Sequence, residues 1–206
     1  CIVNEEIARS GCSGIGWTLH SDIAVPYIER YGTEYQKEKY LSRCVSGELI
    51  TAIAMSEPGA GSDLQGTKTN AVLDGDHYIL NGSKTFITNG QKSGLVIVVA
   101  KTDVNAGSKG ISLFLVESEF EGFSKGKNLE KLGMKAQDTS ELFFQDVRVP
   151  KENLLGEEGR GFIYLMQDLP QERLSIAVGA IANAQALLES TIDYTKERKS
   201  IRSFKV

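Results

Sequence analysis

The segment AMSEPGAGSD, residues 54–63, combines small residues with a hydroxyl in a way that suits ligand binding. It follows an apolar run, and Pro58 and Gly59 force a turn there. Successive backbone N–H groups beside the hydroxyl of Ser62 would suit a pyrophosphate or an acyl-carrier thioester. Taken alone, the segment is equally well explained as an ordinary surface turn.

The segment TFITNG, residues 85–90, offers an aromatic ring and a hydroxyl at the end of an expected strand. Phe86 could pack on a flat heterocycle while Thr88 hydrogen-bonds the polar edge of that heterocycle. By itself this pattern is also typical of a half-buried strand.

The segment QDLPQERLSIA, residues 167–177, supplies a carboxylate. We expect Asp168 to cap a helix and Pro170 to lie in its first turn. This places Glu172 near the positive end of the helix dipole, where a carboxylate is stabilised. An ion pair with Arg173 or simple helix-end electrostatics would explain the same residue.

The surrounding sequence divides into three zones. Residues 2–49 have helical spacing, including a helix from Trp17 to Tyr31 that Pro26 interrupts, and a capping box that opens at Thr33 and closes at Gln36. Residues 50–158 hold β-branched and aromatic runs. Residues 159–206 return to helix, with one apolar side from Leu174 to Ile192 and an end near Lys199.

The middle zone predicts a sheet. Its expected strands are residues 50–55, 67–72, 77–80, 95–100, 111–116 and 142–149. Asp74-Gly75 and Asn81-Gly82 are typical of tight turns between strands. Strands without intervening helices favour an antiparallel sandwich or barrel over a doubly wound sheet, and the dinucleotide fingerprint G-x-G-x-x-G does not follow any strand.

Composition excludes several classes of function. A net charge of −4 and a pI near 5.4 disfavour nucleic acid and anionic membranes as partners. Three cysteines without a CxxC pair and two histidines make a zinc site improbable, and the odd cysteine number suits a reducing compartment. Because the first residue is Cys1 and not Met, we expect the natural N-terminus to be missing.

Together, in this order, the three segments resemble the acyl-CoA dehydrogenase family. AMSEPGAGSD is similar to the flavin-and-substrate signature of that family, and NGSKTFITNG, GMKAQDTSELFFQDVRVPKENLLGEEGRGF and YTKERK follow at the expected places. The resemblance covers residues 2–198, and PQERL around Glu172 is most similar to the long-chain branch.

The resemblance implies an α+β multi-domain fold that is truncated at both ends. Residues 1–49 would be part of the N-terminal helical domain, and residues 50–158 the middle antiparallel β-barrel. Residues 159–206 would be the first helix region of a C-terminal helical bundle.

The resemblance also implies an FAD site and an acyl-CoA site. The FAD-binding residues would be Ile53, Met55, Ser56, Gly61, Ser62, Phe86, Ile87, Thr88 and Arg198, the last reaching the FAD of a neighbouring subunit. The substrate-binding residues would be Ser62, Ser108, Lys109, Ile163, Tyr164, Pro170, Gln171, Glu172 and Arg173. Ser108 and Lys109 would lie near the phosphates of CoA. Position 163 is Tyr in some relatives and Ile here.

The implied reaction is FAD-dependent α,β-dehydrogenation of a long-chain acyl-CoA thioester in fatty acid β-oxidation. Glu172 would remove the α-proton while the β-hydrogen leaves as hydride to flavin N5. The implied partners are the acyl-CoA substrate, electron-transferring flavoprotein as electron acceptor, and further copies of the chain in a homo-oligomer. The implied location is the mitochondrial matrix in a eukaryote and the cytoplasm in a bacterium.

Two alternatives stay open. One is a non-catalytic truncated product that binds FAD weakly or not at all, because the sequence departs from the family after Ser200, where Ile201 stands in place of Phe-Gly. The other is an acyl-CoA oxidase relative, which would pass its electrons to oxygen.

Overall fold

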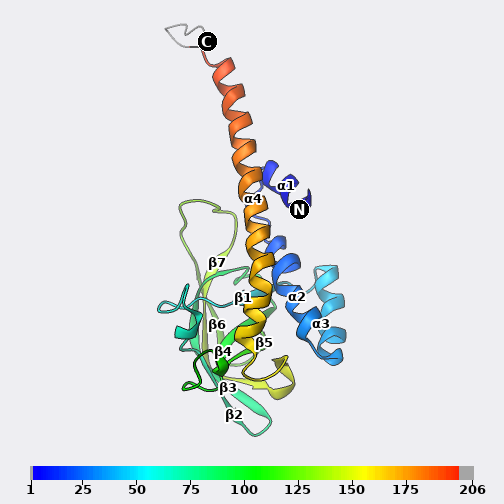
Figure 1. Ribbon diagram of the computed structural model, residues 1–206, viewed down its shortest axis with the longest axis vertical. Helices are drawn as coiled ribbons and strands as arrows, with labels where there is room; N and C mark the ends of the chain where they lie inside the picture. Colours follow the sequence, from blue (N-terminus) through cyan, green and yellow to red (C-terminus); the bar gives the residue numbers. More distant parts are fainter. Residues whose placement is uncertain (1, 200–206) are drawn as a thin grey trace.

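The computed structural model describes residues 2–199, and its elements follow the order helices, sheet, long helix (Figure 1). The divergent residues 201–206 and Ser200 lie outside the described part. The α-helices are α1 (Ile2–Arg9), α2 (Val25–Tyr31), α3 (Glu34–Ser46) and α4 (Gly161–Glu197). A π-helical stretch, η1 (Leu19–Ala24), precedes α2, and short 3-10 helices are η2 (Leu64–Gly66), η3 (Gly107–Gly110) and η4 (Lys151–Asn153). The strands are β1 (Thr51–Ala54), β2 (Asn70–Asp74), β3 (His77–Thr88), β4 (Leu95–Lys101), β5 (Ile111–Glu117), β6 (Phe123–Asn128), β7 (Thr139–Pro150) and β8 (Leu154–Leu155).

The first helices form where the sequence predicts them. Thr33 and Gln36 close the capping box of α3: the N–H of Thr33 donates to Gln36 Oε1 at 3.0 Å, and the N–H of Gln36 donates to Thr33 Oγ1 at 3.2 Å. Pro26 is accommodated in the first turn of α2, just after the π-helical stretch, where the N–H of Val25 donates to the carbonyl of His20. A proline at this position displaces few helical hydrogen bonds.

The strands form one mixed sheet. Its path runs β6-β7-β3-β2-β4-β5-β8, and β1 pairs with β4 in parallel. Most of the other pairs are antiparallel, as predicted. The sheet is open and not the closed barrel that we expected, because in the described residues no pairing joins β6 to β8. β8 has only two residues before the chain turns into α4, which leaves no strand to complete the closure.

β4 lies at the centre of the fold, and its side chains alternate between two apolar cores. Leu95, Ile97 and Val99 pack toward the helices, and the residues between them pack on the opposite face of the sheet. The helix-side core also holds Tyr27, Ile28, Tyr40, Ile53, Tyr164 and Leu165. The sheet therefore carries α2 and α4 on one face.

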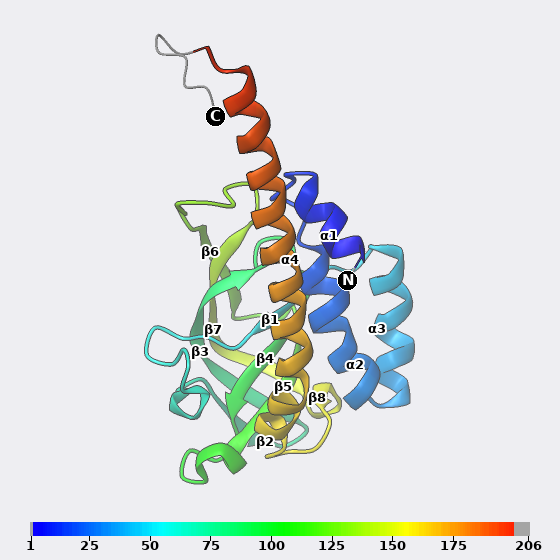
Figure 2. The same ribbon diagram turned by 45° about the horizontal axis from the view of Figure 1, so that its top comes forward.

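α4 is one continuous helix of 37 residues. Figures 1 and 2 show the strands on one flank of its lower half and α2 and α3 on the other, while its C-terminal part extends beyond the rest of the chain. Our prediction of a helix start at Asp168 is wrong, since Asp168, Pro170 and Glu172 all lie inside α4. The burial of Asp168 and Glu172 against α2 outweighs the helical hydrogen bond that Pro170 removes. None of the helices in residues 2–197 is long and apolar enough to cross a membrane.

Of the two predicted turns, one is confirmed. Gly75 turns the chain between β2 and β3 with a φ of +63°. Asn81-Gly82, in contrast, lies inside β3 at a register shift opposite β7, so the turn predicted there is wrong. The amide of Asn81 pairs with the side chain and backbone of Asp146 across the strands, which fixes this bulge.

Candidate functional site

The turn after β1 is held by backbone hydrogen bonds and a buried ion pair. The N–H of Glu57 donates to the carbonyl of Ala60 at 2.8 Å, and the N–H of Ala60 donates back at 3.1 Å. The Glu57 carboxylate accepts from the Lys84 ammonium at 2.9 Å and from the N–H groups of Lys68 and Thr69 at 2.7 and 3.0 Å. The turn is therefore fixed to β3 by contacts within the chain.

The pKa values of both members of this ion pair are shifted. Burial lowers the pKa of Lys84 to about 8, and the Glu57 carboxylate opposes this shift only in part. Burial also raises the pKa of Glu57, but hydrogen bonds from Lys84 and the backbone outweigh burial and bring that pKa below its usual range. Both groups thus carry their charges at neutral pH.

Gly59 and Gly61 are not required by the packing of the chain. Neither has a positive φ, and among the described residues nothing lies within 4 Å of a Cβ built at either position. Both glycines and Ser62 are exposed. A glycine that the chain itself does not need is what a close ligand approach would require.

Phe86 has an unusual conformation at the end of β3. Its φ is +59°, in the left-handed region, and its side chain is 70% exposed. It lies in a register shift between β3 and β7, where the pairing passes from Lys84 to Ile87. An aromatic residue in this region costs about 1–2 kcal/mol, and such strain clusters at ligand sites.

The end of β1 and this bulge lie side by side, because the N–H of Thr85 donates to the carbonyl of Ser56 at 3.0 Å. Met55 and Ser56 at the end of β1 and Thr88 at the end of β3 are half-buried. Ile53 and Ile87, also expected at the flavin, are buried in the two cores and can offer only backbone atoms. An open ring, bare backbone and hydroxyls fit a flat heterocycle with polar edges, such as the isoalloxazine of FAD.

The residues expected at CoA lie on neighbouring loops. Ser108 is half-buried and Lys109 exposed in η3. A Cβ built on Gly107 would lie 3.9 Å from the side chain of Gln65 in η2, the short helix that follows Ser62. The structure therefore brings the loop of Ser62 and the loop of Ser108 together.

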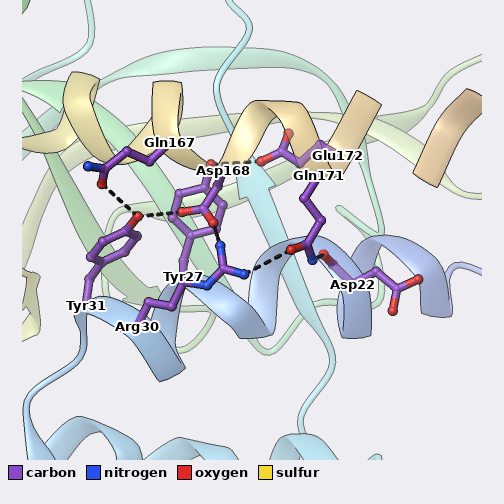
Figure 3. Close-up of polar contacts among 8 residues, drawn as sticks. All are labelled: Asp22, Tyr27, Arg30, Tyr31, Gln167, Asp168, Gln171 and Glu172. Atoms are coloured by element: carbon purple, nitrogen blue, oxygen red, sulfur yellow. Dashed lines mark hydrogen bonds and ion pairs between the residues drawn. The ribbon is translucent and has the colours of Figure 1, made fainter. Parts of the chain in front are cut away.

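Glu172 points toward α2 and is 8% exposed. The hydroxyl of Tyr27, which is fully buried, donates to Glu172 Oε1 at 2.8 Å (Figure 3). Burial raises the pKa of Glu172, and the hydrogen bond from Tyr27 and the charge of Arg173 partly oppose this shift. A half-desolvated carboxylate with a raised pKa has the properties of a general base.

A network of polar contacts surrounds this pair and joins α2 to α4 (Figure 3). Arg30 forms an ion pair with the buried Asp168 and donates to Gln171 Oε1 at 2.9 Å. The hydroxyl of Tyr31 donates to Asp168 Oδ2 at 2.7 Å. Gln171 in turn donates to the backbone carbonyl of Asp22 at 3.1 Å. These contacts hold α4 to α2 over the turn that leads into Glu172.

The other expected substrate residues divide between surface and interior. Ile163, Pro170 and Arg173 are exposed on α4. Tyr164 is buried: its ring stacks on Tyr31 with centroids 4.1 Å apart, and its hydroxyl accepts from the N–H of Glu157. Tyr164 therefore serves the α2–α4 contact in this structure.

Arg198 caps the far end of α4, where its guanidinium lies 5.9 Å from the ring centroid of Tyr194. This end extends away from the sheet (Figure 1). Within one chain the structure does not bring Arg198 to the β1–β3 site.

Three family profiles match consecutive parts of the chain. They are the acyl-CoA dehydrogenase N-terminal domain over residues 1–48, the middle domain over residues 52–147 and the C-terminal domain over residues 159–204. The chain belongs to the acyl-CoA dehydrogenase family.

Curated relatives extend the match. The chain is 60% identical over 198 residues to the long-chain specific acyl-CoA dehydrogenase of Mus musculus mitochondria, a match that covers 95% of this chain and 46% of the relative. It is 48% identical to the isovaleryl-CoA dehydrogenase of Pongo abelii mitochondria, covering 97% of this chain and 48% of the relative. The chain thus spans about half the length of the curated relatives it matches.

Solved structures share the fold. An acyl-CoA dehydrogenase from Geobacillus kaustophilus matches with a TM-score of 0.94 and 55% identity, covering 97% of this chain and 53% of that one. A Bacillus anthracis acyl-CoA dehydrogenase complexed with FAD matches with a TM-score of 0.90 and 38% identity, covering 98% and 35%. The order of helices, sheet and helix is therefore confirmed as the fold of the family.

The sequence did not reveal the residues that support the site. The Tyr27–Glu172 pair and the Glu57–Lys84 pair join positions 145 and 27 residues apart. The one local signal is Tyr27 and Tyr31, four residues apart on α2, which places both rings on the face that meets α4.

Proposed function

We propose that this chain carries the flavin- and substrate-binding part of an FAD-dependent acyl-CoA dehydrogenase that acts on long-chain acyl-CoA thioesters. The supporting observation is the presence of two features in one fold: an open aromatic-and-hydroxyl surface at the end of β1 and β3, and a buried Glu172 with a raised pKa on α4. Long-chain preference is supported by the 58–60% identity to long-chain specific relatives from three mammals.

On the cofactor side, Met55, Ser56, Phe86 and Thr88 would hold the ring of FAD, and the backbone at Gly61 and Ser62 would lie against the cofactor or the CoA portion. FAD, when bound, accepts the two electrons that the acyl chain loses. The buried Glu57–Lys84 pair keeps the turn in place, so that the surface is preorganised before the ligand arrives.

On the substrate side, Glu172 removes the proton from the α-carbon. Burial raises the pKa of its carboxylate and so makes it a stronger base than an exposed carboxylate. Ser108 and the exposed ammonium of Lys109 meet the polar CoA portion, while Pro170, Gln171 and Arg173 border the thioester. Ile163 extends this border at the start of α4, and Tyr164 supports it from below through its stacking on Tyr31.

The proposed partners follow from the exposed part of α4. Leu174, Ile181 and Leu188 are 59–71% exposed there, a surface that another subunit would cover and that would place Arg198 near a neighbouring FAD. We propose electron-transferring flavoprotein as the electron acceptor. A solved structure of the electron-transferring flavoprotein of Acidaminococcus fermentans matches this chain with a TM-score of 0.85 and 36% identity. Mitochondrial relatives support the matrix as the location in a eukaryote, and the cytoplasm is proposed for a bacterium.

The decisive test is Glu172→Gln in the chain extended with the C-terminal half of its mouse long-chain relative. This change keeps the shape of the side chain but removes its ability to accept a proton. We expect FAD and acyl-CoA binding to persist while the rate of flavin bleaching by substrate falls about 10²- to 10⁴-fold, the range for a general base. Glu48→Gln, an exposed carboxylate on the loop after α3, is the control that should bleach at the parental rate.

Bleaching of the Glu172→Gln variant at the parental rate would place the base elsewhere. The flavin absorbance of the purified 206-residue chain is a separate test. If the unextended chain shows no flavin absorbance and the extended chain is active, residues of both this chain and the added C-terminal half are needed to form the complete FAD site.

A further inference from the structure

The two carboxylate oxygens of Glu172 have different surroundings. Oε1 accepts the hydroxyl of Tyr27 at 2.8 Å. Among residues 2–199, no hydrogen-bond donor reaches Oε2. Since the side chain keeps 8% of its surface exposed, one oxygen is held and the other is free to accept a proton.

The tyrosine that holds Oε1 is itself fixed. Tyr27 is fully buried in the helix-side core, so its ring has little freedom. One turn further along α2, Arg30 and Tyr31 bind Asp168, and Arg30 also binds Gln171. These contacts fix the register of α2 against α4, and with it the direction of the Tyr27 hydroxyl (Figure 3).

We propose that Tyr27 is a positioning residue for Glu172: its hydroxyl anchors Oε1 and leaves Oε2 as the atom that takes the α-proton. This inference rests on the proposed role of Glu172 as the base. It gives the buried phenol a purpose beyond packing, because a phenylalanine of nearly the same volume would fill the core equally well.

The charge effect of this contact has a definite sign. A hydroxyl that donates to a carboxylate favours its charged form, so the hydrogen bond lowers the pKa of Glu172 while burial raises it. The titratable and charged groups on the packed elements are Asp22 of η1, Tyr27, Arg30 and Tyr31 of α2, and Asp168 and Arg173 of α4. The charge of Asp168 is balanced by its ion pair with Arg30. Tyr27 and Arg173 are therefore the groups that favour the charged form of Glu172.

The first test measures Glu172 without cofactor or activity. In the 206-residue chain labelled with ¹³C at glutamate side chains, the resonance lost in Glu172→Gln identifies the carboxyl, and a pH titration gives its pKa. Tyr27→Phe should raise this pKa by about one unit or more, the effect of one hydrogen bond to a charged group. Tyr78→Phe is the matched control: it removes another buried hydroxyl that donates to a glutamate, Glu158 at 2.7 Å, and should leave the pKa of Glu172 in place.

A second variant covers the case in which Tyr27→Phe fails to fold. Tyr27→3,5-difluorotyrosine keeps the hydroxyl and makes it a stronger donor, so the pKa of Glu172 should fall. An unchanged pKa of Glu172 in either Tyr27 variant that folds would overturn the proposal.

The pH dependence of flavin reduction in the extended chain links the contact to catalysis. Reduction needs the charged carboxylate, so its acidic limb should move to higher pH in Tyr27→Phe by the same amount as the pKa measured by NMR. If the acidic limb of the Tyr27→Phe profile stays in place while Glu172→Gln is inactive, Tyr27 does not position Glu172, but Glu172 remains the base. A shifted NMR pKa with a fully active Glu172→Gln overturns the proposed function instead.

Discussion

The candidate site has two halves, the α2–α4 contact and the end of β1 and β3. They differ in how many of their groups have partners within the chain. At the α2–α4 contact, Glu172, Asp168 and Gln171 are each bound by a side chain of α2. At the end of β1 and β3, the Phe86 ring is 70% exposed and the backbone at Gly61 faces open space. The first half is held by contacts within the described residues, and the second presents surface that none of these residues covers.

This difference separates the two tasks of the site. A base must be held rigidly, because a small displacement of a reacting group is costly. A cofactor surface must stay open for entry, and its groups gain their partners only on binding. Substitutions at the β1–β3 half should therefore fall into two groups. Those at its buried ion pair should destabilise the fold, and those at its open surface should weaken only ligand binding.

The largest effect is expected at the buried Glu57–Lys84 ion pair that supports the turn after β1. Lys84→Met leaves the Glu57 carboxylate buried without its cation, and should lower the free energy of unfolding in denaturant by about 3–5 kcal/mol. The double change Lys84→Met with Glu57→Gln removes the stranded charge and should recover part of this loss. A loss below about 1 kcal/mol in Lys84→Met would mean that the pair does not hold the turn.

Gly61→Val should separate binding from folding. A Cβ at this position meets nothing within 4 Å in the described chain, so the free energy of unfolding should change by no more than about 0.5 kcal/mol. The Kd for FAD, measured by titration of the extended chain, should rise at least about tenfold because the side chain would occupy the ligand's place. Gly75→Val is the contrasting control, since its φ of +63° makes it destabilising without contact to the flavin surface. Unchanged FAD affinity in Gly61→Val would remove Gly61 from the site.

Phe86→Asn tests whether the backbone strain at position 86 serves ligand binding and not the fold. Asn tolerates the left-handed conformation better than Phe, so the ligand-free chain should gain about 0.5–1 kcal/mol in a thermal or denaturant experiment while FAD binding weakens. Phe86→Ala loses the same ring but keeps the conformational cost, and should show no such gain. Destabilisation of the Asn variant would show that the ring supports the fold.

Local signals predicted the elements well where the chain itself decides the structure. The capping box at Thr33, the hairpin at Gly75 and the buried strand β4 all depend on neighbouring residues or on continuous burial. β6 was not predicted, because its residues FSKGKN lack an apolar alternation at the edge of the sheet. The open path of the sheet depends on pairings between distant strands, which no local pattern encodes.

The site could be predicted only as separate segments. The sequence indicated Phe86 and Glu172 by their neighbours, and the structure shows that the surroundings of each depend on distant partners. The register shift that exposes Phe86 is fixed against β7, and the burial of Glu172 against Tyr27 comes from a residue 145 positions away. The helix start predicted at Asp168 was wrong for the same reason, since contacts with α2 carry α4 through Pro170.

The continuity of α4 has a mechanical consequence. Its 37 residues form a rod of about 55 Å at 1.5 Å per residue, anchored at one end and exposed at the other. Pro170 has no N–H to give to the carbonyl of Met166, so the rod is least stiff within one turn of Glu172. The contacts of Asp168 and Gln171 with α2 brace this joint, so only a change that removes them would let a load on the exposed end alter the angle at which the carboxylate is presented.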